Sequence, residues 1–337
     1  MAVGNSQKGG PSKRLEDTMY IFFSILFLVS NWMALEVLLN QSTLSEPVAP
    51  KSMLLAPGKE VPTQSRILFV GDMMFDRTVR QYMEKHGAAY VLSCISDTLK
   101  EYDAVIGNLE GPITNEPSVS LGAPVGDPNN TRFTMPYSTA ALLAQNNVRA
   151  VSLANNHVRD FGDAGIQSTI RALRDADIQF VGDPNDTTNT STVIDVDGTV
   201  FVLVGFNEFF NSYDETIEHI ERYAAHMPVI VFAHWGDEYH AVNALQRKLA
   251  TAFVSSGADL VVGAHPHVVQ TSEYIEGVPV YYSLGNFIFD QYWDTHVTQG
   301  LMLAVTLNQD GYMTVQELPI TLGKDRRTCL TPVTFHN

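Results

Sequence analysis

Histidines, carboxylates and amides follow several short apolar runs of this sequence, where they could bind metal ions. The clearest segment is "GADLVVGAHPHVV", in which His265 and His267 flank Pro266 directly after an apolar run. Proline fixes the local backbone, so the two imidazoles can approach one point from different sides. This segment on its own favours a metal site over a structural role.

Similar side chains end five other apolar runs. Each run alone has an ordinary explanation, because "GD" is typical of a turn and "NNH" could cap a following helix. The recurrence favours a shared site, since ligands of open α/β sheets bind beyond the carboxyl ends of the strands. The residues concerned are Asp72 in "ILFVGDMM", Asn108 and Glu110 in "AVIGNLEG", Asn155, Asn156 and His157 in "SLANNHV", His234 in "VIVFAHWGDEY" with Asp237 and Glu238 behind it, and Asn286 and Asp290 in "YYSLGNFIFD".

The donor types indicate which ions would bind. Histidines, carboxylates and amides form a mixed nitrogen and oxygen set with no cysteine near it. This composition excludes typical structural zinc sites and favours Mn, Fe, Zn or Co in a hydrolytic centre. The set is larger than one tetrahedral ion needs, so we predict two divalent ions about 3.5–4 Å apart, bridged by a carboxylate. Such a pair activates water and stabilises charge on a phosphoryl or acyl oxygen.

Apolar runs alternate with amphipathic stretches from residue 66 onward, which predicts an α/β fold with helices covering a sheet. Strands are predicted at 67–70, 104–106, 150–153, 179–181, 200–206, 228–232, 259–262 and 278–283, and helices at 138–146, 165–175, 215–224 and 242–255. The C-terminal part, from "VPVYYSLGNFIF" to "MTVQELPI", has strands without intervening helices. We expect these strands to form antiparallel pairs that close one side of the domain, in a second sheet packed on the first.

The N-terminal run "MYIFFSILFLVSNWMALEVLL", at 19–39, is long enough to cross a membrane as a helix of about 20 residues. Lysine and arginine precede it and are scarce after it, so a cytoplasmic N-terminus and an extracytoplasmic catalytic domain are expected. A cleaved signal peptide and a buried helix are the alternatives. The predicted organisation is a cytoplasmic tail (1–18), a single-pass cell-membrane anchor (19–39), an extended linker (40–64), one domain (65–324) and a C-terminal tail (325–337).

The net charge bears on the class of partner, and the cysteine content bears on metal binding and disulfide formation. The formal net charge of −16 argues against a nucleic-acid partner, because there is no surplus of lysine and arginine to neutralise phosphates. Only two cysteines occur, Cys94 and Cys329, without metal-type spacing. A disulfide between them is one alternative, and two separate thiols are the simpler interpretation, which we favour.

Six blocks in this order resemble the CapA family of capsule or poly-γ-glutamate biosynthesis proteins. The blocks are "ILFVGDMMFDR", "GNLEGPIT", "SLANNHVRDFGDAG", "FAHWGDEY", "GADLVVGAHPHVVQ" and "YYSLGNFIFD", within a resemblance from Ser65 to about Leu322. That family is in turn similar to the calcineurin-like metallophosphoesterases. The resemblance implies a four-layer sandwich, with two β-sheets flanked by helices around a dinuclear metal centre.

The resemblance also implies metal-binding roles. Asp72 would bind the first metal, and Met74 stands where the wider superfamily usually has a histidine ligand. The bridging carboxylate corresponds to Asn108 or Glu110, and we favour Glu110 because a carboxylate bridges two cations better than an amide. Asn156 would bind the second metal. The remaining ligands would be His234 and His265 for the second metal and His267 for the first.

Three further residues are predicted to act on the substrate. His157 resembles a histidine that acts as general acid without binding metal. Arg77 and Arg159 are candidates to clamp an anionic group, although surface helix charges explain them equally well. Asp160 and Asp163 are expected to shape the turn into the next helix.

The expected function is that of a membrane-anchored CapA-like protein in synthesis or export of an anionic surface polymer such as poly-γ-glutamate. Its chemistry would be metal-dependent hydrolysis or transfer at a phosphoryl or amide centre. Two alternatives remain open at this point. One is a non-catalytic metal-binding partner of membrane-bound polymer synthetase subunits, and the other is a general metallophosphoesterase unrelated to capsule.

Overall fold

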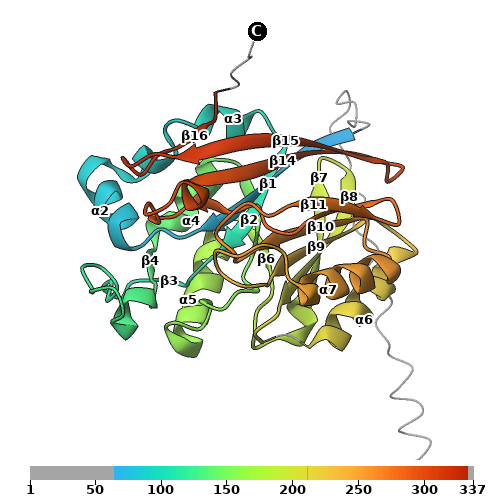
Figure 1. The fold of residues 1–337 in the computed structure, drawn as a ribbon, viewed down its shortest axis with the longest axis horizontal. Coiled ribbons are helices and arrows are strands. Elements are labelled where there is room, and N and C mark those ends of the chain that lie inside the picture. Colours follow the sequence, from blue (N-terminus) through green and yellow to red (C-terminus); the bar gives the residue numbers. More distant parts are fainter. Residues whose placement is uncertain (1–63, 211, 333–337) are drawn as a thin grey trace, which may run out of the picture. The chain divides into compact units, whose positions relative to one another are not determined.

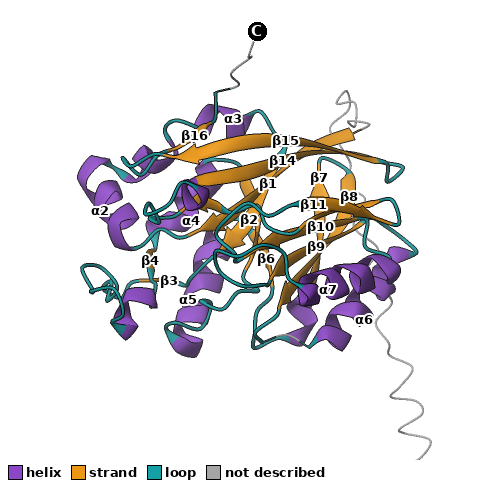
Figure 2. Cartoon of the chain, viewed as in Figure 1, coloured by secondary structure: helices purple, strands orange, loops and turns teal. Residues whose placement is uncertain are grey.

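The computed structural model describes residues 64–210 and 212–332. In this part of the chain two β-sheets pack face to face, and helices cover their outer faces (Figure 1). Strands and helices are interspersed along the chain up to β10, after which strands predominate (Figure 2). This mixed α/β arrangement, with sheets flanked by helices, fits the fold that the resemblance implies.

The first sheet has eight strands in the described residues, in the order β16-β15-β14-β1-β2-β5-β6, with β13 paired to β1. The central strands β1, β2, β5 and β6 run parallel, and β14 to β16 add an antiparallel extension next to β1. The strands are β1 (Gln64–Met73), β2 (Ala104–Leu109), β5 (Val148–Ser152), β6 (Gln179–Val181), β13 (Asn286–Ile288), β14 (Gln299–Asn308), β15 (Met313–Leu322) and β16 (Thr328–Leu330).

The second sheet has six strands in the order β11-β12-β10-β9-β8-β7. Its central strands are parallel and its two edge strands antiparallel. The strands are β7 (Ser191–Val196), β8 (Thr199–Asn207), β9 (Val229–His234), β10 (Leu260–Ala264), β11 (Ser272–Ile275) and β12 (Val278–Tyr281). A separate short pair joins β3 (Ile113–Thr114) to β4 (Met135–Pro136).

Apolar side chains fill three layers between these elements. Phe69 of β1 and Phe232 of β9 meet between the two sheets, with ring centroids 6.3 Å apart. The outer face of the first sheet packs on α2 (Arg77–His86), α3 (Ser96–Lys100), α4 (Ser138–Gln145) and α5 (Gly162–Asp175). The second sheet packs on α6 (Tyr213–Ala224) and α7 (Ala244–Ser255). Short 3₁₀ turns occupy Ala88–Leu92, Pro128–Thr131, Thr187–Thr190 and His296–Thr298.

The four predicted helices appear as α4 to α7, and β14 to β16 pair antiparallel as predicted, but these C-terminal strands do not lie in a second sheet as we expected. They do not form a sheet of their own. β12 lies parallel to β10 in the second sheet, whereas β14 to β16 extend the first sheet. β16 also lies inside the stretch that we expected to be a tail. The cause is register: β14 pairs with β1 from Gln64 to Phe69, which no local pattern in the sequence encodes.

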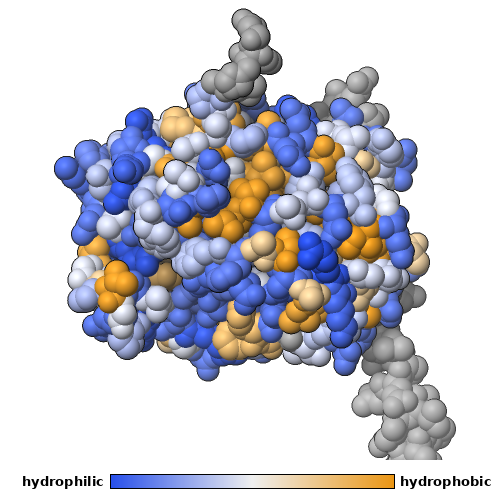
Figure 3. Space-filling view, in the orientation of Figure 1, coloured by the Kyte–Doolittle hydropathy of each residue, from blue (hydrophilic) through white to orange (hydrophobic). Residues whose placement is uncertain are grey.

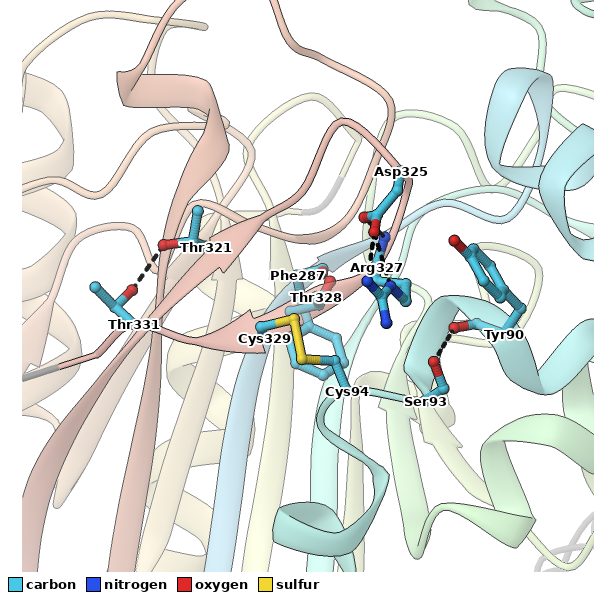
Figure 4. The surroundings of a disulfide bond; sticks show 10 residues. All are labelled: Tyr90, Ser93, Cys94, Phe287, Thr321, Asp325, Arg327, Thr328, Cys329 and Thr331. Carbon is cyan, nitrogen blue, oxygen red and sulfur yellow. Dashed lines mark hydrogen bonds and ion pairs between the residues drawn. A yellow bond between two sulfur atoms is a disulfide. The ribbon is translucent and has the colours of Figure 1, made fainter.

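The favoured interpretation of the cysteines as separate thiols is wrong. Cys94 and Cys329 form a disulfide, with their Cα atoms 5.1 Å apart (Figure 4). β16 pairs with β15 and so carries Cys329 back to the turn that holds Cys94. The bond links residues 235 positions apart in sequence, a distance over which residue spacing carries no signal.

The predicted tail, membrane anchor and linker at the N-terminus lie outside the described residues. Among the helices at 64–210 and 212–332, none is both long and apolar enough to cross a membrane.

Candidate metal centre

Strands of both sheets bring polar side chains to one place. In the first sheet Asp72 lies beside Asn108 of β2 and Asn286 of β13. In the second sheet His234 ends β9 next to Ala264, the last residue of β10. Of the seven predicted ligands, six are buried and Asn156 is half-buried. The predicted ligands thus converge on one interior location, although they are spread over about two hundred positions of sequence.

Asp72, Glu110 and His267 form the first group of donors, with one ligand atom from each within 4.8 Å of the others. His267 Nδ1 lies 3.3 Å from Asp72 Oδ2, and His267 Nε2 lies 3.6 Å from Glu110 Oε1. Asn286 Oδ1 lies 3.0 Å from His267 Nδ1 and so orients the ring.

A second group shares Glu110 and adds His234 and His265, again within 4.8 Å of one another. Asn156 Oδ1 lies 2.8 Å from His234 Nε2, which places the amide oxygen beside this group. Because Glu110 belongs to both groups, its carboxylate has the position of a bridging ligand.

Asn108 holds the carboxylates in place. Its Nδ2 donates to Asp72 Oδ1 at 2.8 Å and to Glu110 Oε2 at 3.3 Å. Its Oδ1 in turn accepts from Asn155 Nδ2 at 3.0 Å. The amide nitrogen, which cannot bind a cation, therefore faces the cluster, and Asn108 serves here as a positioning residue.

The "HPH" segment carries backbone strain. His265 and His267 have φ values of 95° and 58°, in the left-handed region that non-glycine residues rarely adopt. The His265 N–H donates to Asp72 Oδ2 at 3.2 Å, which ties this turn to β1. Strain of this kind is typical of functional sites, and here it aims both imidazoles at the carboxylates.

Two buried polar atoms of the cluster have no hydrogen-bond partner: Glu110 Oε1 and His265 Nδ1. Leaving such groups buried and unpaired costs about 1–3 kcal/mol each, more if charged. Divalent cations would satisfy both, and the nitrogen and oxygen donors suit such ions. The residues therefore fit a metal centre.

Electrostatics support the same interpretation. Burial, with the charge of Asp72 next, raises the pKa of Glu110 well above its ordinary value. Burial also raises the pKa of Asp72, but bonding to His267 and Asn108 outweighs it, so the net shift is downward. Burial, together with the neighbouring histidines, lowers the pKa of His265 to about 4 and that of His234 well below its ordinary value. Both imidazoles are thus neutral near pH 7, as metal ligands must be.

His157 lies at the edge of the cluster. Its Nδ1 is 2.9 Å from Asp160 Oδ2, and its Nε2 is 3.9 Å from Glu110 Oε1. The Phe133 ring covers it, with centroids 4.3 Å apart, and the His157 N–H donates to Asn155 Oδ1. The "NNH" triplet does not cap α5, which begins after Phe161 without a side-chain cap.

The side chain of Met74 is engaged by residues outside the donor groups. Its sulfur accepts a hydrogen bond from the Asp76 N–H at 3.0 Å, and its side chain packs in an apolar cluster with Phe133, Phe289 and Leu322. The position therefore supplies no ligand to either group.

The two predicted anion-binding arginines lie in different surroundings. Arg77 pairs with Asp290 and lies over the Phe133 and Phe289 rings, which also pack on His157 and His267. Arg77 therefore contacts the same aromatic rings as two histidines of the site. The partners of Arg159 are Asp163, Pro184 and Asn185 at the surface, and none of them belongs to the cluster. A substrate-binding role stays a prediction for both.

Sequence reasoning missed the residues that support the cluster. Asp160, expected only to shape a turn, contacts His157 and also accepts from the Phe133 N–H at 2.7 Å. Asn155 and Asn286 were recognised at strand ends but without a role. Their only signal was that each follows an apolar run in the sequence.

A cleft of about 500 Å³ adjoins the cluster at Tyr239, whose ring centroid is 6.0 Å from that of His267. Trp293, Val242 and Val269 are among its lining residues, and Trp293 meets Tyr239 edge-on. The surface drawn in Figure 3 is otherwise mostly hydrophilic, with apolar side chains gathered beside β14. None of the seven predicted ligands is among the residues that line this cleft.

Comparisons with known proteins identify the family of this chain. Residues 66–291 match the family described as "Bacterial capsule synthesis protein PGA_cap". The chain is 30% identical to "Capsule biosynthesis protein CapA" of Bacillus anthracis, over 75% of this chain and 66% of that protein, which is just under two thirds of its length. It is 28% identical to "PGA biosynthesis protein CapA" of Bacillus subtilis (strain 168), over 75% of this chain and 70% of that protein.

A solved structure, "Crystal structure of Chaetomium thermophilum Vps29", aligns with a TM-score of 0.23 and 11% identity, over 56% of this chain and 83% of that chain. This likeness is too low to bear on the fold or the function.

Proposed function

This chain belongs to the bacterial capsule synthesis protein family PGA_cap, and we propose that it is a metal-dependent hydrolase or transferase in the synthesis or export of an anionic surface polymer. Poly-γ-glutamate is the polymer that the relatives' names suggest. The reaction class proposed is attack at a phosphoryl or amide centre. The partners proposed are the polymer and membrane-bound synthetase subunits.

One observation carries the proposal: two donor groups share Glu110 at the meeting point of both sheets. Glu110 is fully buried, and its Oε1 has no hydrogen-bond partner. A protein does not bury ionisable groups in this number without a compensating partner. Two divalent ions such as Mn, Fe, Zn or Co would provide that compensation, and a carboxylate bridge is typical of two-metal hydrolytic centres.

The residues around the donors support catalysis as well as binding. Bound divalent ions would supply Lewis-acid activation of a water and of the phosphoryl or acyl oxygen. His157 donates a proton to the leaving group, because its Nε2 faces Glu110 from the edge of the cluster. Asp160 holds the ring through Nδ1. Phe133 covers the ring and limits access of water to it.

We propose that the described domain lies outside the cytoplasm, held by the anchor predicted at 19–39. The disulfide between Cys94 and Cys329 supports this location, since disulfides persist in oxidising compartments. The membrane orientation predicted from the charges that flank 19–39 also places the domain outside the cytoplasm.

Metal analysis of the full-length chain tests the proposal. Wild type is expected to bind two divalent ions, and His234→Ala and His267→Ala are expected to bind fewer. His296→Ala is the matched control, because His296 is exposed and pairs only with neighbouring Asp294. Equal metal content in all four proteins would contradict the proposed centre.

Activity assays then separate the functional alternatives. The Mn-loaded chain is incubated with p-nitrophenyl mono- and diesters and with poly-γ-glutamate, and products are followed. Release of product from any of them, lost in His267→Ala, supports an enzyme. Full metal occupancy without turnover of any substrate would instead favour a non-catalytic partner of a synthetase.

A further inference from the structure

A third donor group lies on the outer side of the cluster. Glu238, His265 and His267 each offer a ligand atom within 4.8 Å of the others. Glu238 differs from every other carboxylate in these groups because it is exposed, whereas Asp72 and Glu110 are completely buried. It is therefore the carboxylate through which the cluster meets solvent.

The backbone holds Glu238 against the "HPH" turn. Its segment leaves the end of β9, and the Tyr239 N–H donates to the Pro266 carbonyl at 2.8 Å. On the other side, the Gly236 N–H donates to Glu208 Oε2 at 2.9 Å. Gly236 has a φ of 85°, and a Cβ there would lie 2.6 Å from the Gln246 side chain. The turn therefore requires glycine and is fixed at both ends.

The numbers of donors in the two main groups are unequal. The second group has Asn156 beside its three donors, whereas the first consists of Asp72, Glu110 and His267. Met74, two residues after Asp72, is committed to an apolar cluster and a hydrogen bond from Asp76. The first group therefore has three donors, and it shares His267 with the group of Glu238.

We propose that Glu238 is a further metal ligand, which supplies a carboxylate oxygen to the ion held by Asp72, Glu110 and His267. This inference rests on the proposed two-metal function. Tyr239 positions the ligand, since its hydroxyl hydrogen-bonds to Glu238 and accepts from Gln291 Nε2 at 3.0 Å. Partners of this kind orient ligating carboxylates in metal sites. Because Glu238 is exposed, the first ion exchanges with solvent more readily than the second.

Titration of the full-length chain with Mn²⁺ tests the assignment. Glu238→Gln keeps the shape of the side chain and removes its charge. We expect two binding events in wild type and, in Glu238→Gln, the weaker event to lose affinity by about tenfold or more while the tighter one is unchanged. Asp237→Asn is the control, because it removes one charge from the same turn while Asp237 bonds only to Asn243 outside the cluster.

The outcomes distinguish the two proposals. Unchanged affinities in Glu238→Gln, with two events in wild type, would overturn the role of Glu238 and leave the two-metal centre intact. Equal weakening in Asp237→Asn would also overturn it, because long-range charge would then explain the effect. Fewer than two events in wild type would overturn both proposals.

Discussion

Single side chains decide whether this cluster binds metal and whether it does chemistry. His157 touches the edge of the cluster, belongs to none of the donor groups and is held by Asp160. Glu110 lies in two donor groups and has a buried, unpartnered oxygen. Variants of Glu110 therefore test metal binding, and variants of His157 test catalysis.

Replacement of His157 by alanine is expected to lower turnover by about 10²–10⁴-fold, which is the usual contribution of a positioned general acid. The metal content of the variant should equal that of wild type, because His157 is not a donor. Metal analysis and steady-state kinetics on the same preparation check both statements. Unchanged kcat would show that His157 does not transfer the proton.

Glu110→Gln is expected to stabilise the metal-free protein at neutral pH by about 1–3 kcal/mol. The pKa of Glu110 is raised in the folded state, so the stability associated with its protonated form is present below its ordinary value of 4.5 and is lost as pH rises through the folded value. Glutamine stays uncharged and avoids this loss.

Thermal unfolding with and without Mn²⁺ measures the effect. Wild type should gain more stability from the ion than Glu110→Gln does, so the order of the two proteins should reverse on loading. A metal-free variant that is less stable than wild type at neutral pH would contradict the argument.

At the scale of elements, close approach between strands sets the position of the ligands. Gly71 precedes Asp72 in β1, and a Cβ at Gly71 would lie 1.9 Å from the Gly285 carbonyl oxygen. β1 can therefore pair with β13 at this register only with glycine at position 71. The same approach brings Asn286 next to Asp72 and so orients His267.

Gly71→Ala is expected to destabilise the protein by about 1–3 kcal/mol and to weaken Mn²⁺ binding, because β1 and β13 must separate. Gly205→Ala is the matched control in β8, where the nearest neighbours, Val181 and Ala154 at 3.1 and 3.2 Å, need to shift by only a few tenths of an ångström. Denaturant unfolding and metal titration of both variants provide the comparison. Normal metal affinity in Gly71→Ala would show that the spacing of β1 and β13 does not control the position of Asp72.

At the scale of the whole domain, the disulfide ties the last strand of the first sheet to the segment after α2. Thr328, next to Cys329, donates through its hydroxyl to the Phe287 carbonyl, and the Arg327 guanidinium lies over the Tyr90 ring (Figure 4). β16 is thus attached by a covalent bond as well as by its pairing with β15.

Removal of the disulfide by Cys94→Ser with Cys329→Ser is expected to cost about 2–5 kcal/mol of unfolding free energy. Reductant should lower the Tm of wild type toward that of the double variant and leave the double variant unchanged. If reductant also lowers the Tm of the double variant, the loss of stability has a cause other than the disulfide. The metal content should not change, because neither cysteine belongs to a donor group.

The sequence by itself determined the local features of this protein. Alternating apolar runs predicted the α/β class and the helices α4 to α7, because burial leaves a periodic pattern in each element. The polar residues at strand ends identified the candidate ligands, because parallel strands deliver their carboxyl ends to one edge. The six ordered blocks identified the family, which the comparisons confirmed.

Only the tertiary structure decided which distant segments meet. The pairing of β14 with β1, the disulfide, and the contacts of Asp160 and Asn286 with histidines depend on sheet register and face-to-face packing. The approach of Glu238 to "HPH" depends on a glycine turn and one backbone hydrogen bond. Periodicity reports how one element is buried but not which element lies opposite, so these contacts had no counterpart in the linear pattern.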